Sequence, residues 1–248
     1  MPRVLIPPGA LQGDTAIVTD PRELHHLLHV LRVKPGDRLE CFDGAGRRAW
    51  GRVSRCTAKE LVVALERIGQ EPATDLHVTL AHALIKPDRF DWAVQKATEL
   101  GVNRIVPLIT QRTTVRLPAD GADRKVARWE RIVREAAKQC GCATLPLVES
   151  PQRFADFASG LDTGGAALLA TLEAPTTPIA EALEPLGRQL TLLIGPEGDF
   201  TREEVLLGQR HGAKPVSLGV QTLRSETAAV AALAMVRYQQ MMDQRKDS

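Results

Sequence analysis

The sequence has no apolar run long enough to cross a membrane. Its 248 residues contain no uninterrupted hydrophobic stretch near the ~20 residues that a spanning helix needs. The first residues, 1–7, also lack the hydrophobic centre of a secretion signal. We therefore expect a cytoplasmic protein with no membrane partner.

Cysteine is scarce as well, and its spacing is not that of a metal site. The four cysteines are Cys41, Cys56, Cys140 and Cys142. They lack the paired two-residue spacing of structural zinc sites and suit a reducing compartment. His25 and His29 would share one helix face, but no third ligand accompanies them, so no metal is predicted.

The chain also carries little net charge. The formal net charge is only +2, which does not by itself demand a nucleic acid. Basic residues do crowd one segment, at Arg112, Arg116, Arg124, Lys125, Arg128, Arg131, Arg134 and Lys138. Acidic residues are interspersed among them. Two interpretations stay open: a solvated helix face with local ion pairs, or a surface that faces RNA.

The first part of the chain has the pattern of a small β-rich unit. Strands are expected at 3–6, 38–42, 49–54 and 61–66, and a helix at 21–31. The turn Asp43-Gly44-Ala45-Gly46 is a hairpin signal. Residues 69–75 combine breakers and polar residues, as linkers do. We therefore expect one domain over 1–70 and another over 76–248.

The second part alternates strands with helices, which predicts an α/β domain with a mostly parallel sheet. Strands are expected at 76–81, 104–108, 166–171, 190–194 and 215–218, and helices at 89–100, 122–140, 178–183, 202–211 and 225–242. No Gly-x-Gly-x-x-Gly follows a strand, which argues against a Rossmann-type dinucleotide site.

Two loops in the last third each follow an apolar strand and precede a helix. The first is Gly195-Pro196-Glu197-Gly198, and the second runs from Leu218 to Arg224. Ligands bind where such loops meet at one edge of an open sheet. Thr201 and Glu204 have the spacing of a capping box, and Ser225 is expected to cap the last helix.

These loops and several upstream blocks resemble the RsmE family of the SPOUT superfamily. The blocks are His29–Arg32, Phe42–Gly44, Gln95–Val102 with Ile105 and Pro107, Gln111–Thr113 and Glu135–Gln139, all in the family's order. The resemblance covers most of the chain. It implies methylation of uridine N3 in 16S ribosomal RNA with S-adenosylmethionine, a C-terminal trefoil knot, an N-terminal PUA-like RNA-binding β-barrel and a homodimer.

The resemblance also implies which segments hold S-adenosylmethionine. They contribute Thr171, Leu172, Glu173, Ile194, Gly195, Pro196, Glu197, Gly198, Ser217, Leu218, Gly219, Leu223, Arg224, Ser225, Thr227 and Ala228. A core role for the leucines and a structural turn at 171–173 remain alternatives. A bulky residue at Gly198 is expected to fill the first loop. Asp199 replaces the family's usual glycine, and we expect the loop to keep its shape because Asp reaches left-handed angles.

Methyl transfer is an in-line displacement, so it depends on positioning. Uracil N3 must lose a proton, and the developing charge needs donors. Arg224 is the candidate for holding the substrate phosphate or base oxygens, since guanidinium offers several coplanar donors. Glu226 has three open interpretations: it orients Arg224, accepts the proton, or stabilises the first turn of a helix.

The resemblance places RNA contacts at Arg32, Arg47, Arg48, Arg112 and Gln139. Naked 16S ribosomal RNA and the assembled small subunit both remain possible partners. Two alternative functions stay open. One is a ribose 2′-O-methyltransferase of the same superfamily, and the other is a non-catalytic RNA-binding factor in ribosome assembly.

Overall fold

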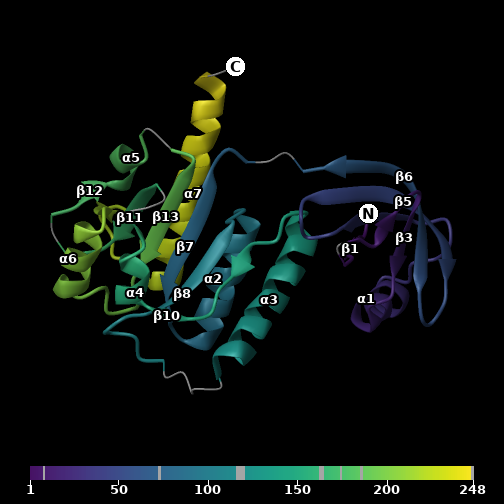
Figure 1. The fold of residues 1–248 in the computed structure, drawn as a ribbon, viewed down its shortest axis with the longest axis horizontal. Helices are drawn as coiled ribbons and strands as arrows, with labels where there is room; N and C mark the ends of the chain where they lie inside the picture. Colours follow the sequence, from purple (N-terminus) through teal and green to yellow (C-terminus); the bar gives the residue numbers. More distant parts are fainter. Residues whose placement is uncertain are drawn as a thin grey trace. The chain divides into compact units, whose positions relative to one another are not determined.

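The computed structural model describes residues 1–7, 9–71, 74–115, 121–161, 165–173, 175–184 and 187–246. Contacts divide the chain into two compact units (Figure 1). The first unit comprises residues 1–73 and 134–145, and the second comprises 74–133 and 146–248. Residues 134–145 thus group with the N-terminal unit, although the sequence suggested a single cut near residue 70. Arg116 and linker residues 72–73 lie outside the described residues.

The first unit is a curled six-stranded sheet. Its strands are β1 (Arg3–Leu5), β2 (Leu11–Gln12), β3 (Thr15–Val18), β4 (Arg38–Phe42), β5 (Arg47–Cys56) and β6 (Leu61–Gln70), in the order β1-β4-β5-β6-β3-β2. Among the described pairings of this sheet, β1 with β4 is the parallel one and the others are antiparallel. The expected hairpin joins β4 to β5, and the Asp43 carboxylate accepts hydrogen bonds from the backbone N–H groups of Ala45 and Arg47. Strands β2 and β3 were not predicted because they are too short for a periodic signal.

The predicted helix over 21–31 is helical, but its second half is not α. Helix α1 (Pro21–His25) begins at Asp20, whose carboxylate accepts from the N–H of Arg22. A π-helix (His26–Val30) then follows, and Arg32 at φ 55° comes after it. Over so few turns, hydrophobic spacing does not distinguish the two helix types.

The second unit is an α/β domain with an eight-stranded sheet. Its strands are β7 (His77–Ala83), β8 (Arg104–Ile109), β9 (Leu147–Val148), β10 (Gln152–Arg153), β11 (Ala166–Ala170), β12 (Thr177–Pro178), β13 (Gln189–Ile194) and β14 (Ala213–Ser217). The order is β10-β8-β7-β13-β11-β14-β12, with β9 beside β8. Every described pairing is parallel, as predicted.

Helices connect these strands, and residues 134–140 of the helix over 121–140 group with the first unit. The helices are α2 (Pro87–Glu99), α3 (Gly121–Cys140), α4 (Phe154–Ala158), α5 (Ile179–Ala182), α6 (Arg202–Arg210) and α7 (Ser225–Lys246). Helix α2 packs against α7, and α4 packs against α6 (Figure 1). Successive strand residues such as Leu168 and Leu169 are both buried, so both faces of the sheet are covered. No helix among the described residues is long and apolar enough to span a membrane.

Candidate active site

Three parallel strands end together at one edge of the second unit's sheet. Strand β11 lies between β13 and β14, and its last residue, Ala170, is in register with Ile194 on one side and Val216 on the other. The segments that follow these strands therefore start side by side. This is the edge at which open α/β sheets bind ligands.

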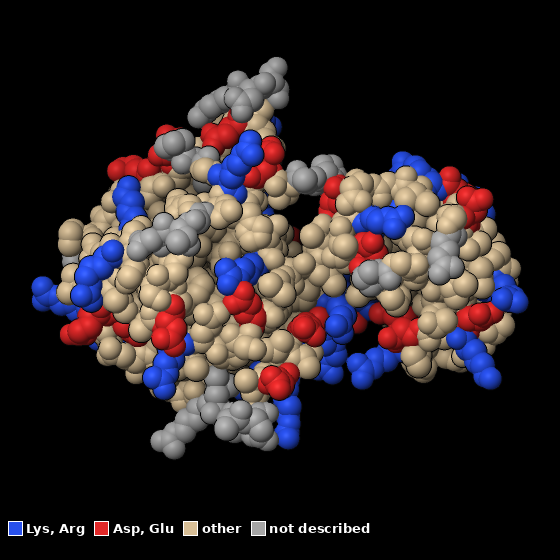
Figure 2. Space-filling model, in the orientation of Figure 1, with Lys and Arg blue, Asp and Glu red and all other residues tan. Residues whose placement is uncertain are grey.

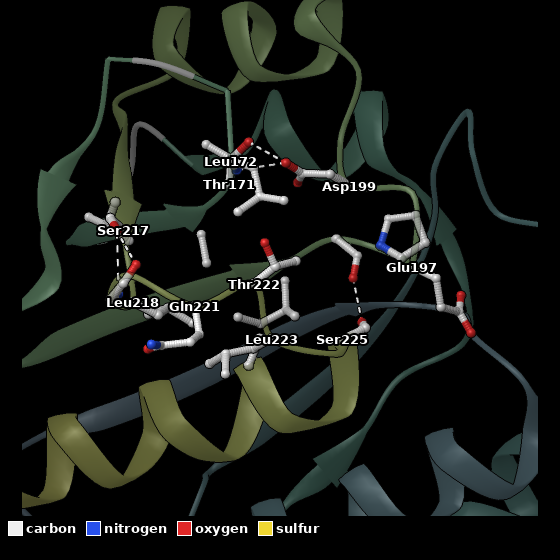
Figure 3. Close-up of a pocket in the computed structure, with 17 residues that line it drawn as sticks. Thr171, Leu172, Glu197, Asp199, Ser217, Leu218, Gln221, Thr222, Leu223 and Ser225 are labelled. Carbon is white, nitrogen blue, oxygen red and sulfur yellow. Dashed lines mark hydrogen bonds between the residues drawn. The ribbon is translucent and has the colours of Figure 1, made fainter.

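These segments and the start of α7 enclose a pocket of about 590 Å³, counted with its solvent-filled mouth (Figure 3). Many of the residues predicted to bind S-adenosylmethionine line this pocket: Thr171, Leu172, Ile194, Gly195, Pro196, Glu197, Ser217, Leu218, Gly219, Leu223, Ser225 and Ala228. Four other predicted residues, Glu173, Gly198, Arg224 and Thr227, are not among its lining residues. The structure thus brings most of the predicted set together from three separate parts of the chain.

Sequence reasoning missed five lining residues: Ala170, Asp199, Val216, Gln221 and Thr222. Gln221 and Thr222 lie inside the second predicted loop, so the loop itself was the available signal. Ala170 and Val216 are strand residues, which the sequence alone assigns to a core. Asp199 attracted notice only as a departure from the family pattern.

The first loop is held tightly at Gly195. A Cβ atom there would lie 3.1 Å from the backbone nitrogen of Phe200 and 3.2 Å from the Asp199 carboxylate, closer than side chains normally pack. After this loop, α6 begins with the predicted capping box. Thr201 Oγ1 accepts from the Glu204 N–H, and the Glu204 carboxylate accepts from the Thr201 N–H at 2.9 Å. The other Glu204 oxygen accepts from the Gln111 N–H at 2.8 Å.

Asp199 has a left-handed φ of 62°. This agrees with the expectation that an aspartate can adopt the backbone angle this loop needs. Its carboxylate accepts hydrogen bonds from Thr171 Oγ1 at 2.9 Å and from the Leu172 N–H at 2.7 Å. The residue that replaces the usual glycine therefore joins two walls of the pocket.

The second loop is tied to the first by Ser225. The sequence suggested that Ser225 caps α7, but α7 begins at Ser225 itself, and the Ser225 hydroxyl donates to the carbonyl oxygen of Gly195 (Figure 3). The capping prediction is wrong because Ser225 already lies inside the helix, whose first backbone bond runs from the Ala228 N–H to the carbonyl oxygen of Arg224 at 2.8 Å. Within the second loop, the Ser217 hydroxyl accepts from the Gly219 N–H at 3.3 Å.

A charged cluster lies beside the pocket wall. Arg89 of α2 lies 3.6 Å from the carboxylate of Glu197 and 3.8 Å from that of Glu226. The Glu197 carboxylate points away from the cavity (Figure 3). Glu226 is mostly buried, and its Oε2 has no hydrogen-bond partner among the described residues. Sequence reasoning missed Arg89, which lies far from both glutamates along the chain.

His82 of β7 is completely buried next to this cluster. Its Nδ1 lies 2.6 Å from the carbonyl oxygen of Ala83, and its Nε2 lies 3.5 Å from the Ser225 hydroxyl. A carbonyl only accepts, so Nδ1 carries the proton. Burial lowers the pKa of His82 and outweighs the opposing hydrogen bonds and the nearby carboxylates of Glu226 and Glu197. The imidazole is therefore neutral at neutral pH.

Arg224, the predicted substrate contact, and Arg112, a predicted RNA contact, differ in their contacts. Arg224 is exposed, and its guanidinium makes no hydrogen bond to a described residue. Arg112 instead donates to the carbonyl oxygens of Gly198 at 2.5 Å and Phe200 at 3.3 Å. A Cβ at Gly198 would meet the Arg112 side chain at 3.3 Å. A bulky residue at Gly198, which was expected to fill the first loop, would therefore press on Arg112, and Gly198 is not among the residues that line the pocket.

In the first unit, the predicted RNA contacts Arg32, Arg47 and Gln139 are exposed. Arg48 is instead engaged inside the unit. Its guanidinium donates to Glu40 at 3.1 Å, to Glu71 at 2.5 Å and to the carbonyl oxygen of Gly141. Burial alone lowers the pKa of Arg48, but the two carboxylates outweigh it and raise that pKa.

The predicted basic segment is balanced by acidic partners at several points. Arg128 pairs with Asp91 at 2.5 Å, and Lys138 pairs with Glu23 and Glu135 at 2.8 Å each. Figure 2 likewise shows Lys and Arg mixed with Asp and Glu on the visible face of each unit. These pairs fit the interpretation of a solvated face with local ion pairs.

The described residues contain no group of three or more His, Cys, Asp or Glu side chains arranged to hold a metal ion. The rings of His25 and His29 do share a helix face, with centroids 5.0 Å apart. No third ligand accompanies them in the described part of the chain.

Comparison with known families matches both parts of the chain. The model of an RNA methyltransferase domain matches residues 72–237, and that of an RNA methyltransferase PUA domain matches residues 18–66. A curated relative, ribosomal RNA small subunit methyltransferase E of Synechocystis, is 34% identical over 237 residues, covering 94% of this chain and 76% of the relative. The Bacillus subtilis protein of that name is 28% identical and covers 88% of each chain.

Solved structures show the same fold. Ribosomal RNA small subunit methyltransferase E from Neisseria gonorrhoeae, bound to S-adenosylmethionine, superposes with a TM-score of 0.86 at 29% identity, over 96% of this chain and 97% of that one. A methyltransferase from Legionella pneumophila, also with S-adenosylmethionine, superposes with a TM-score of 0.82 at 30% identity, over 95% and 96%. This chain therefore belongs to the RNA methyltransferase family that includes ribosomal RNA small subunit methyltransferase E, and it combines that enzyme domain with a PUA domain.

Proposed function

We propose that this chain transfers a methyl group from S-adenosylmethionine to N3 of a uridine in 16S ribosomal RNA, in the cytoplasm. One observation carries the proposal: three parallel strands end in register and lead into segments that enclose one pocket. Relatives that share the fold over nearly their whole length bind S-adenosylmethionine. This pocket is the proposed binding site for the methyl donor, S-adenosylmethionine.

The lining fits such a donor. Apolar side chains, including Leu218 and Leu223, offer a surface for a flat base, while hydroxyls and loop backbone offer polar partners. The bound donor would supply an electrophilic methyl group on a sulfonium. The protein then has to hold the two reactants in line, which requires rigid loops more than a reactive side chain.

We assign the substrate contact to Arg224. Its side chain is exposed and makes no hydrogen bond to a described residue, so its donors are available to a phosphate or to the uracil oxygens. Changing Arg224 to Ala should reduce turnover strongly and leave the dissociation constant of S-adenosylmethionine unchanged. Unchanged turnover would remove this assignment.

Two features of Glu226 bear on its role. Its ion pair with Arg89, and not with Arg224, favours a role in holding the start of α7 against α2. Its buried, unpartnered oxygen also leaves capacity to accept the N3 proton. Glu226→Gln keeps the shape and removes the charge. Loss of turnover with normal donor and RNA affinity would support proton acceptance, and normal turnover would exclude it.

Calorimetry with S-adenosylmethionine tests the donor site. Ala228 lines the pocket from the first turn of α7, so Ala228→Phe should occupy the space that the donor needs. Ala127→Phe is the matched control, because Ala127 is an exposed helical residue in α3 outside the pocket. We expect binding to wild type and the control and none to Ala228→Phe. Equal binding to all three would place the donor elsewhere.

Two further features belong to the proposal. We expect the PUA domain to help bind the RNA through exposed residues such as Arg32 and Arg47. We also expect a homodimer formed through the α7 face that carries Ala228, Ala231, Met235 and Tyr238, and Tyr238 is 64% exposed. The trefoil knot stays a prediction from the family resemblance.

A further inference from the structure

Asp199 has a backbone angle that glycine also adopts and a side chain that glycine lacks. Its backbone has a left-handed φ of 62°, which glycine adopts freely. Its side chain, however, spans from the first loop to the segment after β11. We propose that Asp199 is a positioning residue that holds the donor pocket in its binding shape before the donor arrives. This inference rests on the proposed function of the pocket.

The bonds made by Asp199 are short and well defined. Oδ2 accepts from Thr171 Oγ1 at 2.9 Å and from the Leu172 N–H at 2.7 Å (Figure 3). Oδ1 accepts from the Phe200 N–H at 2.7 Å. Hydrogen bonds to an ionised carboxylate are shorter and stronger than those between neutral groups. Two of the three bonds cross between different walls of the pocket.

Thr171 is itself oriented for this contact. Its Oγ1 accepts from the Glu173 N–H at 3.1 Å, while its hydroxyl hydrogen is directed to Asp199. The Thr171 N–H also donates to the carbonyl oxygen of Val216 at 3.2 Å, at the end of β14. Asp199 thus connects the first loop, through Thr171, to the strand that leads into the second loop.

Among the described residues just after β11, Thr171 is buried but Leu172 is not. The Leu172 side chain is 67% exposed, so it contributes little burial. On the other side of the pocket, the Ser225 hydroxyl already ties α7 to Gly195. Asp199 supplies the matching tie on this side. A pocket fixed in advance loses less conformational entropy when it binds a ligand, so the tie should appear as affinity.

Calorimetry on the full chain distinguishes this role from a simple charge effect. The ligands are S-adenosylmethionine, a sulfonium cation, and its demethylated product S-adenosylhomocysteine, which has a neutral sulfur. We expect Asp199→Gly to weaken both by about tenfold, which corresponds to about 1.4 kcal/mol. Asp199→Asn should fall in between, because its amide oxygen can still accept from Thr171 and Leu172. A charge effect would instead weaken only the sulfonium, equally in both variants.

Two measurements guard against a folding artefact. Thr171→Val removes one donor and leaves the backbone of the first loop untouched, and combining it with Asp199→Gly should weaken binding by less than the sum of the single effects. Hydrogen exchange of the Leu172 N–H in the ligand-free protein should be faster in Asp199→Gly than in wild type.

Wild-type affinity for both ligands in Asp199→Gly would overturn this inference and leave the proposed function standing. A wild type that binds neither ligand would overturn the proposed function, and this inference with it.

Discussion

His82 makes stability depend on pH because its imidazole is buried in the neutral form. Its pKa in the folded protein is lowered by burial from the ordinary value of 6.5. Below that pH the unfolded chain takes up a proton that the folded chain does not. The free energy of unfolding should therefore fall by up to about 1.4 kcal/mol per pH unit until His82 is protonated in the folded state as well.

Thermal melts between pH 7.5 and 5.0 measure this effect. His82→Asn, which keeps a donor near the position of Nδ1, should lower stability at pH 7.5 but reduce its dependence on pH. His77→Asn is the control, because His77 lies on the same strand and is exposed. The same acid slope in wild type and His82→Asn would show that other groups are responsible.

Single residues also show how far sequence analysis reached. The loop residues of the pocket were predictable because loops that follow apolar strands carry recognisable motifs. Arg89 and His82 were not predictable, because they lie more than a hundred residues from Glu226 along the chain. In the sequence, Arg89 is simply the first residue of an expected helix, and His82 directly follows an expected strand. Asp199 was noticed, but its bonds to Thr171 and Leu172 depend on strand register that no local pattern contains.

The capping box of α6 sets the direction of the helix that follows the first loop. Thr201→Ala removes the acceptor for the Glu204 N–H and should lower the free energy of unfolding by about 1 kcal/mol. In a chain of this size that corresponds to about 2–4 °C in melting temperature. Gln209→Ala, at an exposed position of the same helix, should change it much less. Equal effects would mean that the cap contributes nothing specific.

Arg47 and Arg48 are neighbours on β5 with different expected roles. Arg48→Ala should lower the free energy of unfolding by about 1–3 kcal/mol, because Glu40 and Glu71 each lose a charged hydrogen-bond donor. Arg47 is exposed, so Arg47→Ala should leave stability within about 0.5 kcal/mol.

Binding of a 16S ribosomal RNA fragment then separates the two arginines. Arg47→Ala should weaken binding and reduce its dependence on salt, since one phosphate contact is lost. Equal melting temperatures for the two variants would contradict the structural role of Arg48. Unchanged RNA affinity in Arg47→Ala would remove Arg47 from the proposed RNA-binding surface.

The sequence predicted long helices and strands better than short ones. The long helices α2, α3 and α7 and the five longer strands of the parallel sheet were expected near their observed positions, since each presents several turns or alternations of burial. The two-residue strands β2, β9, β10 and β12 and the short helix α4 were missed. Elements of this length are defined by their neighbours in the sheet rather than by their own pattern.

At the scale of the whole molecule, α7 provides the proposed dimer surface. Tyr238 and Met241, three residues apart on this helix, are 64% and 58% exposed and so present apolar surface to solvent. We expect a dimer in sedimentation velocity and a shift toward monomer in Tyr238→Glu. Gln240→Glu is the control, since a glutamate can still accept from Arg237. A monomeric wild type would contradict the proposal.

Division into two units was partly predictable from the sequence. The change from short strands to alternating strands and helices occurs near residue 70, where the contacts also separate. Residues 134–145 group with the first unit because Arg48 and Glu71 bind the segment just beyond α3. That grouping depends on side-chain contacts between residues 72 and 93 positions apart, which composition and periodicity do not reveal.

The central claim is tested most directly by identifying the methylated atom. Purified protein is incubated with unmodified 16S ribosomal RNA, or with small subunits that contain it, and with S-adenosylmethionine, and the RNA is then digested for nucleoside mass spectrometry. We predict N3-methyluridine with wild type and with Ala127→Phe, and none with Ala228→Phe. A methyl group on ribose 2′-oxygen, or no methylation of either substrate by a protein that binds the RNA, would contradict the account.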